Sequence, residues 1–139
     1  MRLTVAAGDE IPSPDIPVKT GHTFIGWSPA LPEIMPKYDI EVKALWSVNK
    51  YTINFDSNGG TNVEPITQNY GTLVEAPSKP VRSGYEFKGW YDNNGELVNF
   101  PFYMSAVNTR LTAHWLEASY SIIFKLNATD KDAYYKITG

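Results

Sequence analysis

The side chains that could perform acid–base or nucleophilic chemistry in this chain are few and widely separated. The 139 residues include two histidines, His22 and His114, and no cysteine. A serine hydrolase needs a serine, a histidine and an acid held together, and a zinc site needs three or four clustered ligands. No spacing around either histidine supplies such a group. We expect His22 to have a packing role and His114 to lie exposed on a strand face.

The carboxylates offer no better catalytic arrangement. Asp9, Glu10 and Asp15 stand near prolines and are expected to be solvated loop residues. A glycoside hydrolase needs two carboxyl groups that face each other across a cleft. The Asp-Lys-Asp run at 130–132 could bind calcium weakly, but it lacks the glycine and the distal glutamate of a calcium loop, so a solvated turn is expected. The sequence therefore predicts no catalytic residue, no metal and no cofactor.

Two further patterns could each be a functional site, and each also has a purely structural interpretation. Residues 56–60, Asp-Ser-Asn-Gly-Gly, could cradle a phosphate, but the Lys-Ser/Thr and the following helix of such loops are missing, and a tight turn is expected. Lys50 and Lys125 lie on or beside expected strands and could cross-link to an asparagine, as in some surface adhesins. Nothing fixes an asparagine partner, and an intact mass lower by one ammonia would reveal the bond.

The composition is that of a folded, strand-rich protein. Hydrophobic residues make up 42% and charged residues 19%, and there are 4 Trp, 9 Tyr and 6 Phe. Large aromatic side chains favour strands, and ten prolines with ten glycines supply turns. The net charge is −3 with no basic stripe, which argues against a nucleic-acid partner. No run approaches the roughly 20 apolar residues of a membrane-spanning helix, so no transmembrane segment is expected.

The strands and turns that must hold these side chains belong to a sequence pattern that occurs twice. Five positions of a first copy recur 63 residues later, and they are Gly8, Pro17, Gly21, Gly26 and Trp27, repeated as Gly71, Pro80, Gly84, Gly89 and Trp90. The closing segments, 42–46 and 111–115, are 69 residues apart instead. The six extra residues predict an insertion in the second copy, which we place at the turn-forming sequence 92–96.

The repeat divides the chain into three parts. A strand begins after each closing tryptophan, at 51–56 and again at 120–125. We predict the C-terminal part of a first module over residues 1–46 and a complete second module over 51–115. Residues 120–139 are expected to start a third module or link to another domain. The first copy lacks its opening strand, which it could borrow from residues 1–6, from Tyr51 onward or from another molecule. We expect the natural parent to extend beyond both ends.

Period-two alternation within the second copy predicts its strands. Tyr51, Ile53 and Phe55 alternate with polar residues, which indicates one buried face. A second strand is expected over 63–74, where Pro65 suggests an edge or an irregularity. Short helical turns are possible at 76–80 and 105–108.

The remaining two strands carry the tryptophans. In a third strand over 86–91, simple alternation places Phe87 and Gly89 on one face and Trp90 on the other. The closing strand, 110–115, is expected to point Leu111, Ala113 and Trp115 inward. A turn is expected at 84.

A longer string of motifs in the second copy resembles a known family. It runs from Tyr51 to Gly60 (YTINFDSNGG), then through Tyr70-Gly71, Ala76-Pro77 and Gly84 to Tyr91 (GYEFKGWY), to Leu111 to Trp115 (LTAHW). This string resembles the Listeria–Bacteroides repeat, the family of internalin B-repeats. The resemblance implies an α+β, mostly β class, with tandem small β-grasp-like (ubiquitin-like) modules and little helix. It brings no catalytic residues.

The resemblance also implies tandem arrays in secreted or wall-attached bacterial proteins, acting as stalks or spacers and sometimes contributing to host-cell attachment. The expected location is extracellular, at the bacterial cell surface, with neighbouring repeats of the same chain as partners. The structural signature that we expect to hold each module consists of Gly21, Gly26, Trp27, Trp46, Gly59, Gly60, Gly84, Gly89, Trp90 and Trp115.

The alternative function is binding of a host protein or glycan through exposed aromatic side chains. Tyr91, Phe102 and Tyr103 are the candidates, because rings in such a patch can stack on sugars or contact a protein. The plainer interpretation is that they close the small core or the seam between modules, and it is the one we favour.

Overall fold

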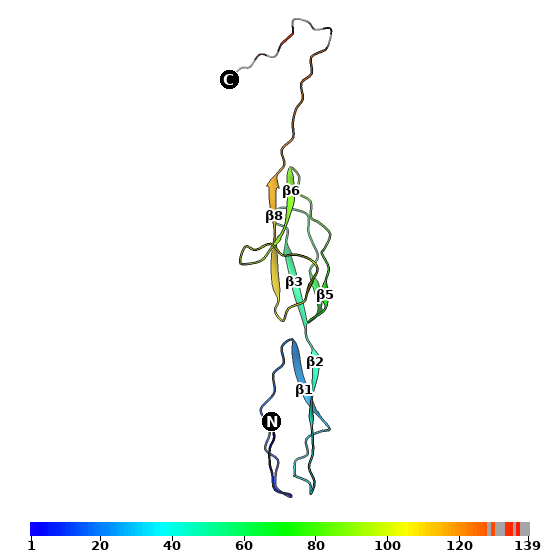
Figure 1. The fold of residues 1–139 in the computed structure, drawn as a ribbon, viewed down its shortest axis with the longest axis vertical. Helices are drawn as coiled ribbons and strands as arrows, with labels where there is room; N and C mark the ends of the chain where they lie inside the picture. Colours follow the sequence, from blue (N-terminus) through cyan, green and yellow to red (C-terminus); the bar gives the residue numbers. More distant parts are fainter. Residues whose placement is uncertain (128, 130–132, 135, 137–139) are drawn as a thin grey trace.

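Strands, turns and irregular segments make up the described part of the molecule, a computed structural model of residues 1–127, 129, 133–134 and 136. No helix occurs among these residues. The eight strands are β1 (His22–Ser28), β2 (Lys43–Val48), β3 (Lys50–Asp56), β4 (Ile66–Asn69), β5 (Leu73–Val74), β6 (Tyr85–Tyr91), β7 (Phe102–Tyr103) and β8 (Thr109–Glu117). Figure 1 shows β1 and β2 in one body and the later strands in a second, placed end to end along the longest axis.

The second module is built on a mixed four-stranded sheet with the order β4-β3-β8-β6. The pairs β3–β4 and β6–β8 are antiparallel, whereas β3 and β8 run parallel. The first and last strands of the module are therefore neighbours at the centre of the sheet. A separate two-stranded sheet of β5 and β7 accompanies it.

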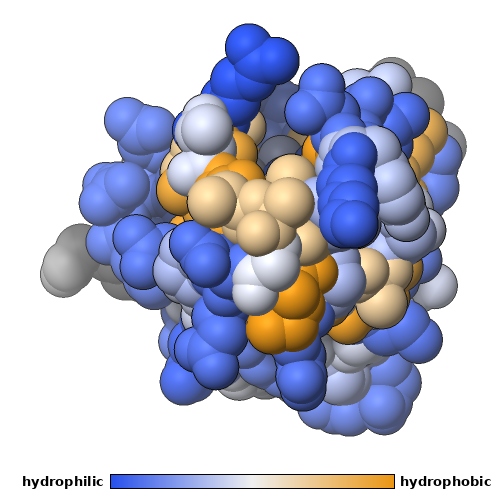
Figure 2. Space-filling view, turned by 90° about the horizontal axis from the view of Figure 1, so that it is seen from below, coloured by the Kyte–Doolittle hydropathy of each residue, from blue (hydrophilic) through white to orange (hydrophobic). Residues whose placement is uncertain are grey.

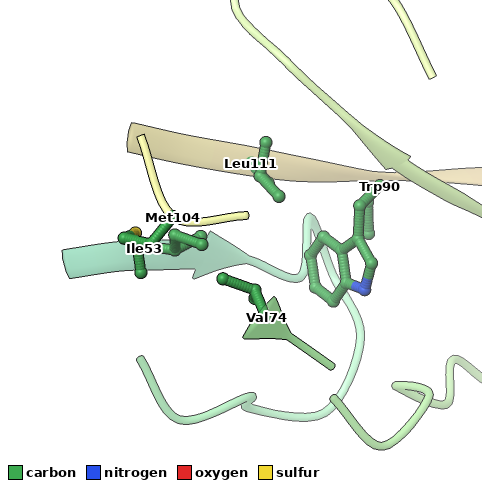
Figure 3. Packing of buried hydrophobic residues seen from close by; sticks show 6 residues of the cluster. Ile53, Val74, Trp90, Met104 and Leu111 are labelled. Carbon is green, nitrogen blue, oxygen red and sulfur yellow. The ribbon is translucent and has the colours of Figure 1, made fainter. Parts of the chain in front are cut away.

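The core of the second module contains six buried residues contributed by several strands. They are Ile53, Val74, Trp90, Met104, Leu111 and Ala113, and Figure 3 shows the labelled side chains gathered between β3, β5 and β8. Half-buried rings surround them, with Phe55 lying 4.8 Å from Trp90 between ring centroids. The inward positions expected for the closing strand are confirmed, since Leu111 and Ala113 are buried and Trp115 packs against them.

The expected second strand, 63–74, is wrong as a single element. It is divided into β4 and β5, which belong to different sheets. Tyr70 and Gly71 form a turn between them. Gly71 has a positive φ of 76°, a conformation that interrupts a strand and that glycine adopts without strain.

The helical part of the expected α+β class is also wrong, whereas the mostly β part is confirmed. The segment 76–80 is neither helix nor strand, and 105–108 contains only a bend at 106–107. Pro77 and Pro80 explain the first case, because each lacks the amide hydrogen that a helical turn needs and restricts the preceding residue to extended conformations. The expected turn at 92–96 is confirmed, with the Asp92 amide donating to the Glu96 carbonyl at 2.9 Å.

The placement of Phe87 and Trp90 on opposite faces is wrong. The register of β6 against β8 shifts between Phe87 and Gly89, so Lys88 and Gly89 together face one residue, His114. A β-bulge of this kind adds one residue and reverses the alternation that follows. The rings of Phe87 and Trp90 therefore lie on the same side, 5.4 Å apart.

The buried tryptophan of the second module provides a test of this core. Trp90 is 4% exposed, and replacing a buried tryptophan by alanine costs about 3–5 kcal/mol. A core of this size supplies no more than about 3–5 kcal/mol in total, so Trp90→Ala is expected to unfold the second module in thermal and urea melts. Tyr103→Ala, at a side chain 72% exposed, is the control and should leave the melt unchanged. A wild-type melt for Trp90→Ala would contradict the core assignment.

Candidate functional site

The Gly-Trp signature is a β-bulge that occurs in both modules. In β1 the register against β2 shifts between Phe24 and Gly26, as it does at the matching place in β6. Gly26 and Gly89 have φ values of 140° and 127°, which side chains with a Cβ rarely adopt. The bulge brings Phe24 to 5.1 Å from Trp27, the counterpart of the ring pair in the second module. The signature is therefore a device for placing two large rings on one face.

The Asn-Gly-Gly turn of the second module holds the closing tryptophan. The indole Nε1 of Trp115 donates to the Ser57 carbonyl at 2.9 Å. Asn58, at a φ of 48°, donates its side-chain amide to the Ala113 carbonyl at 3.1 Å. A Cβ on Gly60 would overlap the Trp115 ring. Glycine is needed here because the indole lies directly on the backbone.

Asp56 ties the same turn to the closing strand. Its carboxylate accepts from the Asn58 amide at 3.0 Å and from the Arg110 guanidinium at 2.8 Å. The backbone hydrogen bond, followed by the arginine, lowers the pKa of the Asp56 carboxyl. Gly59, the other glycine of the turn, has a φ of 96° and lies against the Arg82 side chain.

The two modules are joined through a single residue, Asn49, which lies between β2 and β3. The Asn49 amide donates to the Gly21 carbonyl of the first module at 2.8 Å, and its carbonyl accepts from the Tyr70 amide of the second at 2.8 Å. Its side chain accepts from the Thr23 hydroxyl at 2.5 Å and donates to the Tyr51 hydroxyl at 3.3 Å. Every polar group of Asn49 thus bonds to one of the two modules.

Aromatic packing covers this junction. Gly21 is buried against the ring of Tyr70, and a Cβ on Gly21 would collide with that ring. The imidazole of His22 meets the same ring edge-on, 5.9 Å between centroids, and its Nδ1 lies 2.7 Å from the Thr20 carbonyl. The predicted packing role of His22 is therefore realised at the junction between modules.

At its far end, the second module has the backbone hydrogen bond of this junction but not its aromatic contact. The Ala118 amide donates to the Gly84 carbonyl at 2.9 Å, as the Asn49 amide does to Gly21. Gly84 has a φ of 78°, close to the 70° of Gly21, but the space beside it is open.

The three aromatic candidates for a partner surface occupy different environments. Tyr91 is half-buried and stacks on the imidazole of His114, 3.7 Å between centroids. Phe102 packs against the core, whereas its strand neighbour Tyr103 points outward. Adjacent residues of a strand face opposite sides, so Phe102 and Tyr103 do not form one surface.

The residues considered for chemistry are not assembled into a site. Asp9, Glu10, Asp15, Lys50 and Lys125 are all exposed. In the described ranges, no three histidine or acidic side chains are placed to hold a metal ion. The Asp-Lys-Asp run at 130–132 lies outside the described residues. Of the residues that are described, none belongs to a helix able to cross a bilayer.

A known family of repeat domains matches both parts of the chain. The sequence profile of the Listeria-Bacteroides repeat domain matches residues 1–41 and 51–114. The chain belongs to this family.

Relatives of this repeat chain are much longer proteins. Internalin H of Listeria monocytogenes is 37% identical over 99 residues, which cover 65% of this chain and 18% of the relative. Two proteins of Evansella cellulosilytica, whose names describe them as membrane proteins, are 31% and 33% identical over 88% and 86% of this chain. The chain spans only 20% and 15% of their lengths.

Sequence reasoning identified the signature of the repeat domain but missed its junction. No sequence pattern singles out Asn49, and Tyr70 stands out only as part of the family string. Gly21 and Gly84 occupy matching positions of the repeat, and the difference between their environments is visible only in the structure.

Close approach of Trp115 to Gly60 is testable by a double-mutant cycle. Gly60 is not in the left-handed region, so Gly60→Ala introduces crowding without backbone strain. Overpacking of this kind costs about 1–3 kcal/mol, to be measured by urea denaturation. The same substitution in a Trp115→Phe background should cost less, because the smaller ring leaves room for the methyl group. Equal costs in both backgrounds would rule out the indole as the cause.

Proposed function

We propose that this chain is a non-catalytic spacer in a bacterial cell-surface or secreted protein, where its repeats form part of an adhesion stalk. The observation that carries the proposal is the junction at Asn49. A flexible linker would let neighbouring modules reorient, whereas a single residue bonded on both sides fixes them. A stalk needs this property because its reach depends on how well successive modules stay aligned.

The relatives support the proposed cell-surface location and the proposed stalk of repeats. Internalin H and the two Evansella proteins are several times longer than this chain, as expected for proteins that carry repeats beside other parts. We also infer that the module is a helix-free relative of the β-grasp fold, since its first and last strands are parallel neighbours. In this relationship the segment 76–80, which is neither helix nor strand, would take the place of the helix.

Distance measurements across the junction test the spacer function. The chain has no cysteine, so spin labels can be placed through Ile25→Cys and Val107→Cys, both at exposed positions. We expect a single narrow distance distribution in pulsed electron resonance. Gly21→Ala should broaden it, because the added methyl group displaces the Tyr70 ring from the junction.

Gly84→Ala is the matched control for this experiment. It introduces the same left-handed strain as Gly21→Ala, at a similar φ, but meets nothing within 4 Å. Its distance distribution should remain narrow. A broad distribution for the otherwise unaltered labelled chain would refute the rigid spacer.

The alternative function, binding of a host protein or glycan, rests on one exposed pair. Tyr103 on β7 lies opposite Leu73 on β5, and both side chains are exposed. If this pair binds a ligand, the purified chain should give a signal on glycan arrays or host cells, and Tyr103→Ala should abolish it. Tyr38→Ala, at a tyrosine 70% exposed, is the control. Absence of binding at high concentration would leave the spacer as the function.

A further inference from the structure

Two Asn-Gly pairs occur in this chain, Asn58-Gly59 and Asn94-Gly95, and both lie in turns of the second module. Asparagine followed by glycine readily loses ammonia, because glycine has no Cβ to hinder the approach of its backbone nitrogen to the asparagine side chain. All four residues are exposed. Figure 2 shows a face of the molecule on which hydrophilic residues predominate, so water, the other reactant, surrounds turns of this kind.

The reaction needs only the two residues and water. The glycine nitrogen bonds to the asparagine Cγ while the bond from Cγ to the side-chain nitrogen breaks. That nitrogen leaves as ammonia, together with the proton that the glycine nitrogen has lost. Water then opens the cyclic imide at one of its two carbonyl carbons and gives aspartate or isoaspartate. Ring closure has to turn the side-chain amide toward the glycine nitrogen, so hydrogen bonds that hold the amide or its turn slow the reaction.

The turn at Asn58 is held by the closing strand β8. The side-chain amide of Asn58 donates to the Ala113 carbonyl at 3.1 Å. The preceding carbonyl, that of Ser57, accepts from the indole of Trp115 at 2.9 Å. Both partners belong to β8, which lies at the centre of the sheet beside β3. Asn58 is therefore freed only when β8 leaves the turn, which means unfolding of the module.

The turn at Asn94 is held only by hydrogen bonds within itself. The Asp92 carboxylate accepts from the backbone amides of Asn94 at 2.9 Å and Glu96 at 3.0 Å. The Gly95 amide donates to the Asp92 carbonyl at 3.0 Å, and a Cβ on Gly95 would meet nothing within 4 Å. Among the described residues, none forms a hydrogen bond with the Asn94 side chain. A local opening of residues 92–96 is therefore enough to free the Gly95 nitrogen.

We propose that the two pairs are modification sites for different states of the module. Asn94 loses ammonia in the folded module, whereas Asn58 does so only after the module has unfolded. Opening an exposed turn costs little free energy, but a turn tied to the central strands opens with the whole cooperative unit. For a core of this size, folding should slow the reaction of Asn58 by about a hundredfold or more. Aspartate or isoaspartate at position 58 would then be a permanent record of unfolding.

The product at position 58 would also weaken the refolded module. An aspartate has no amide to donate, so it sets an acceptor against the Ala113 carbonyl. It also adds a carboxylate to a turn that contains Asp56, whose own carboxylate accepts from the backbone amide of residue 58 at 3.0 Å. An unsatisfied carbonyl and a like charge should each favour unfolding, and we expect the unfolding equilibrium to shift by about tenfold or more.

Urea denaturation of two aspartate variants tests this consequence. Asn58→Asp should have a lower unfolding midpoint than the unaltered chain. Asn94→Asp is the matched control and should unfold nearly as the unaltered chain does, because its exposed side chain has no partner to lose. Equal midpoints for the two variants would contradict the role assigned to the Asn58 amide.

The rates at the two sites can be followed separately in the unaltered chain. Trypsin releases them in different peptides, 51–82 and 89–110. Mass spectrometry then detects the exchange of nitrogen for oxygen, and chromatography separates aspartate from isoaspartate. In the native chain at mildly alkaline pH, Asn94 should react and Asn58 should be slower by about a hundredfold or more. In urea the two should react at similar rates, because only the Asn-Gly pair then decides.

Equal rates in the native chain, or an Asn94 that reacts only in urea, would overturn the proposal. The measurement needs no substitution, so it does not depend on whether a variant folds. The spacer function is independent of it, because both rates are properties of the second module alone.

Discussion

Parallel pairing of β3 with β8 is the constraint on which the rest of the molecule depends. These are the first and last strands of the second module, and they are neighbours at the centre of its sheet. Because they run in the same direction, the chain enters the module at one end and leaves it at the other. Antiparallel end strands would return the chain to its starting side. The linear arrangement of modules in Figure 1 follows from this pairing.

Large rings and glycines compensate for the small size of each module. Phe55, Phe87 and Trp90 pack with centroid separations of 4.8 and 5.4 Å, and aromatic pairs contribute beyond the area that they bury. To pack in this way, the rings need a backbone that passes close beside them, or a bulge that changes which face of the strand the next side chains occupy. Gly60 meets the first need and Gly89 the second. The glycines and tryptophans of the repeat therefore form one structural unit.

The alternation of apolar and polar residues predicted the faces of a strand correctly where it is undisturbed. It was wrong where one extra residue in a β-bulge reverses the faces. The faces of β8 were predictable because Leu111, Ala113 and Trp115 alternate without interruption. The face of Trp90 was not, because Gly-Trp signals a bulge only when the partner strand is known. Contacts between modules were also beyond reach, since no sequence pattern indicates that Asn49 bonds to both Gly21 and Tyr70.

The direction of the central pair has a mechanical consequence. Tension along an array would pull on the start of β3 and on the end of β8, at opposite ends of the same module. The two strands would then be sheared past each other, so that all four of their residue pairs bear the load together. In a hairpin pulled from its open end, the pairs separate one after another. A sheared parallel pair resists far more, and each module would hold its length under traction until the whole pairing fails at once.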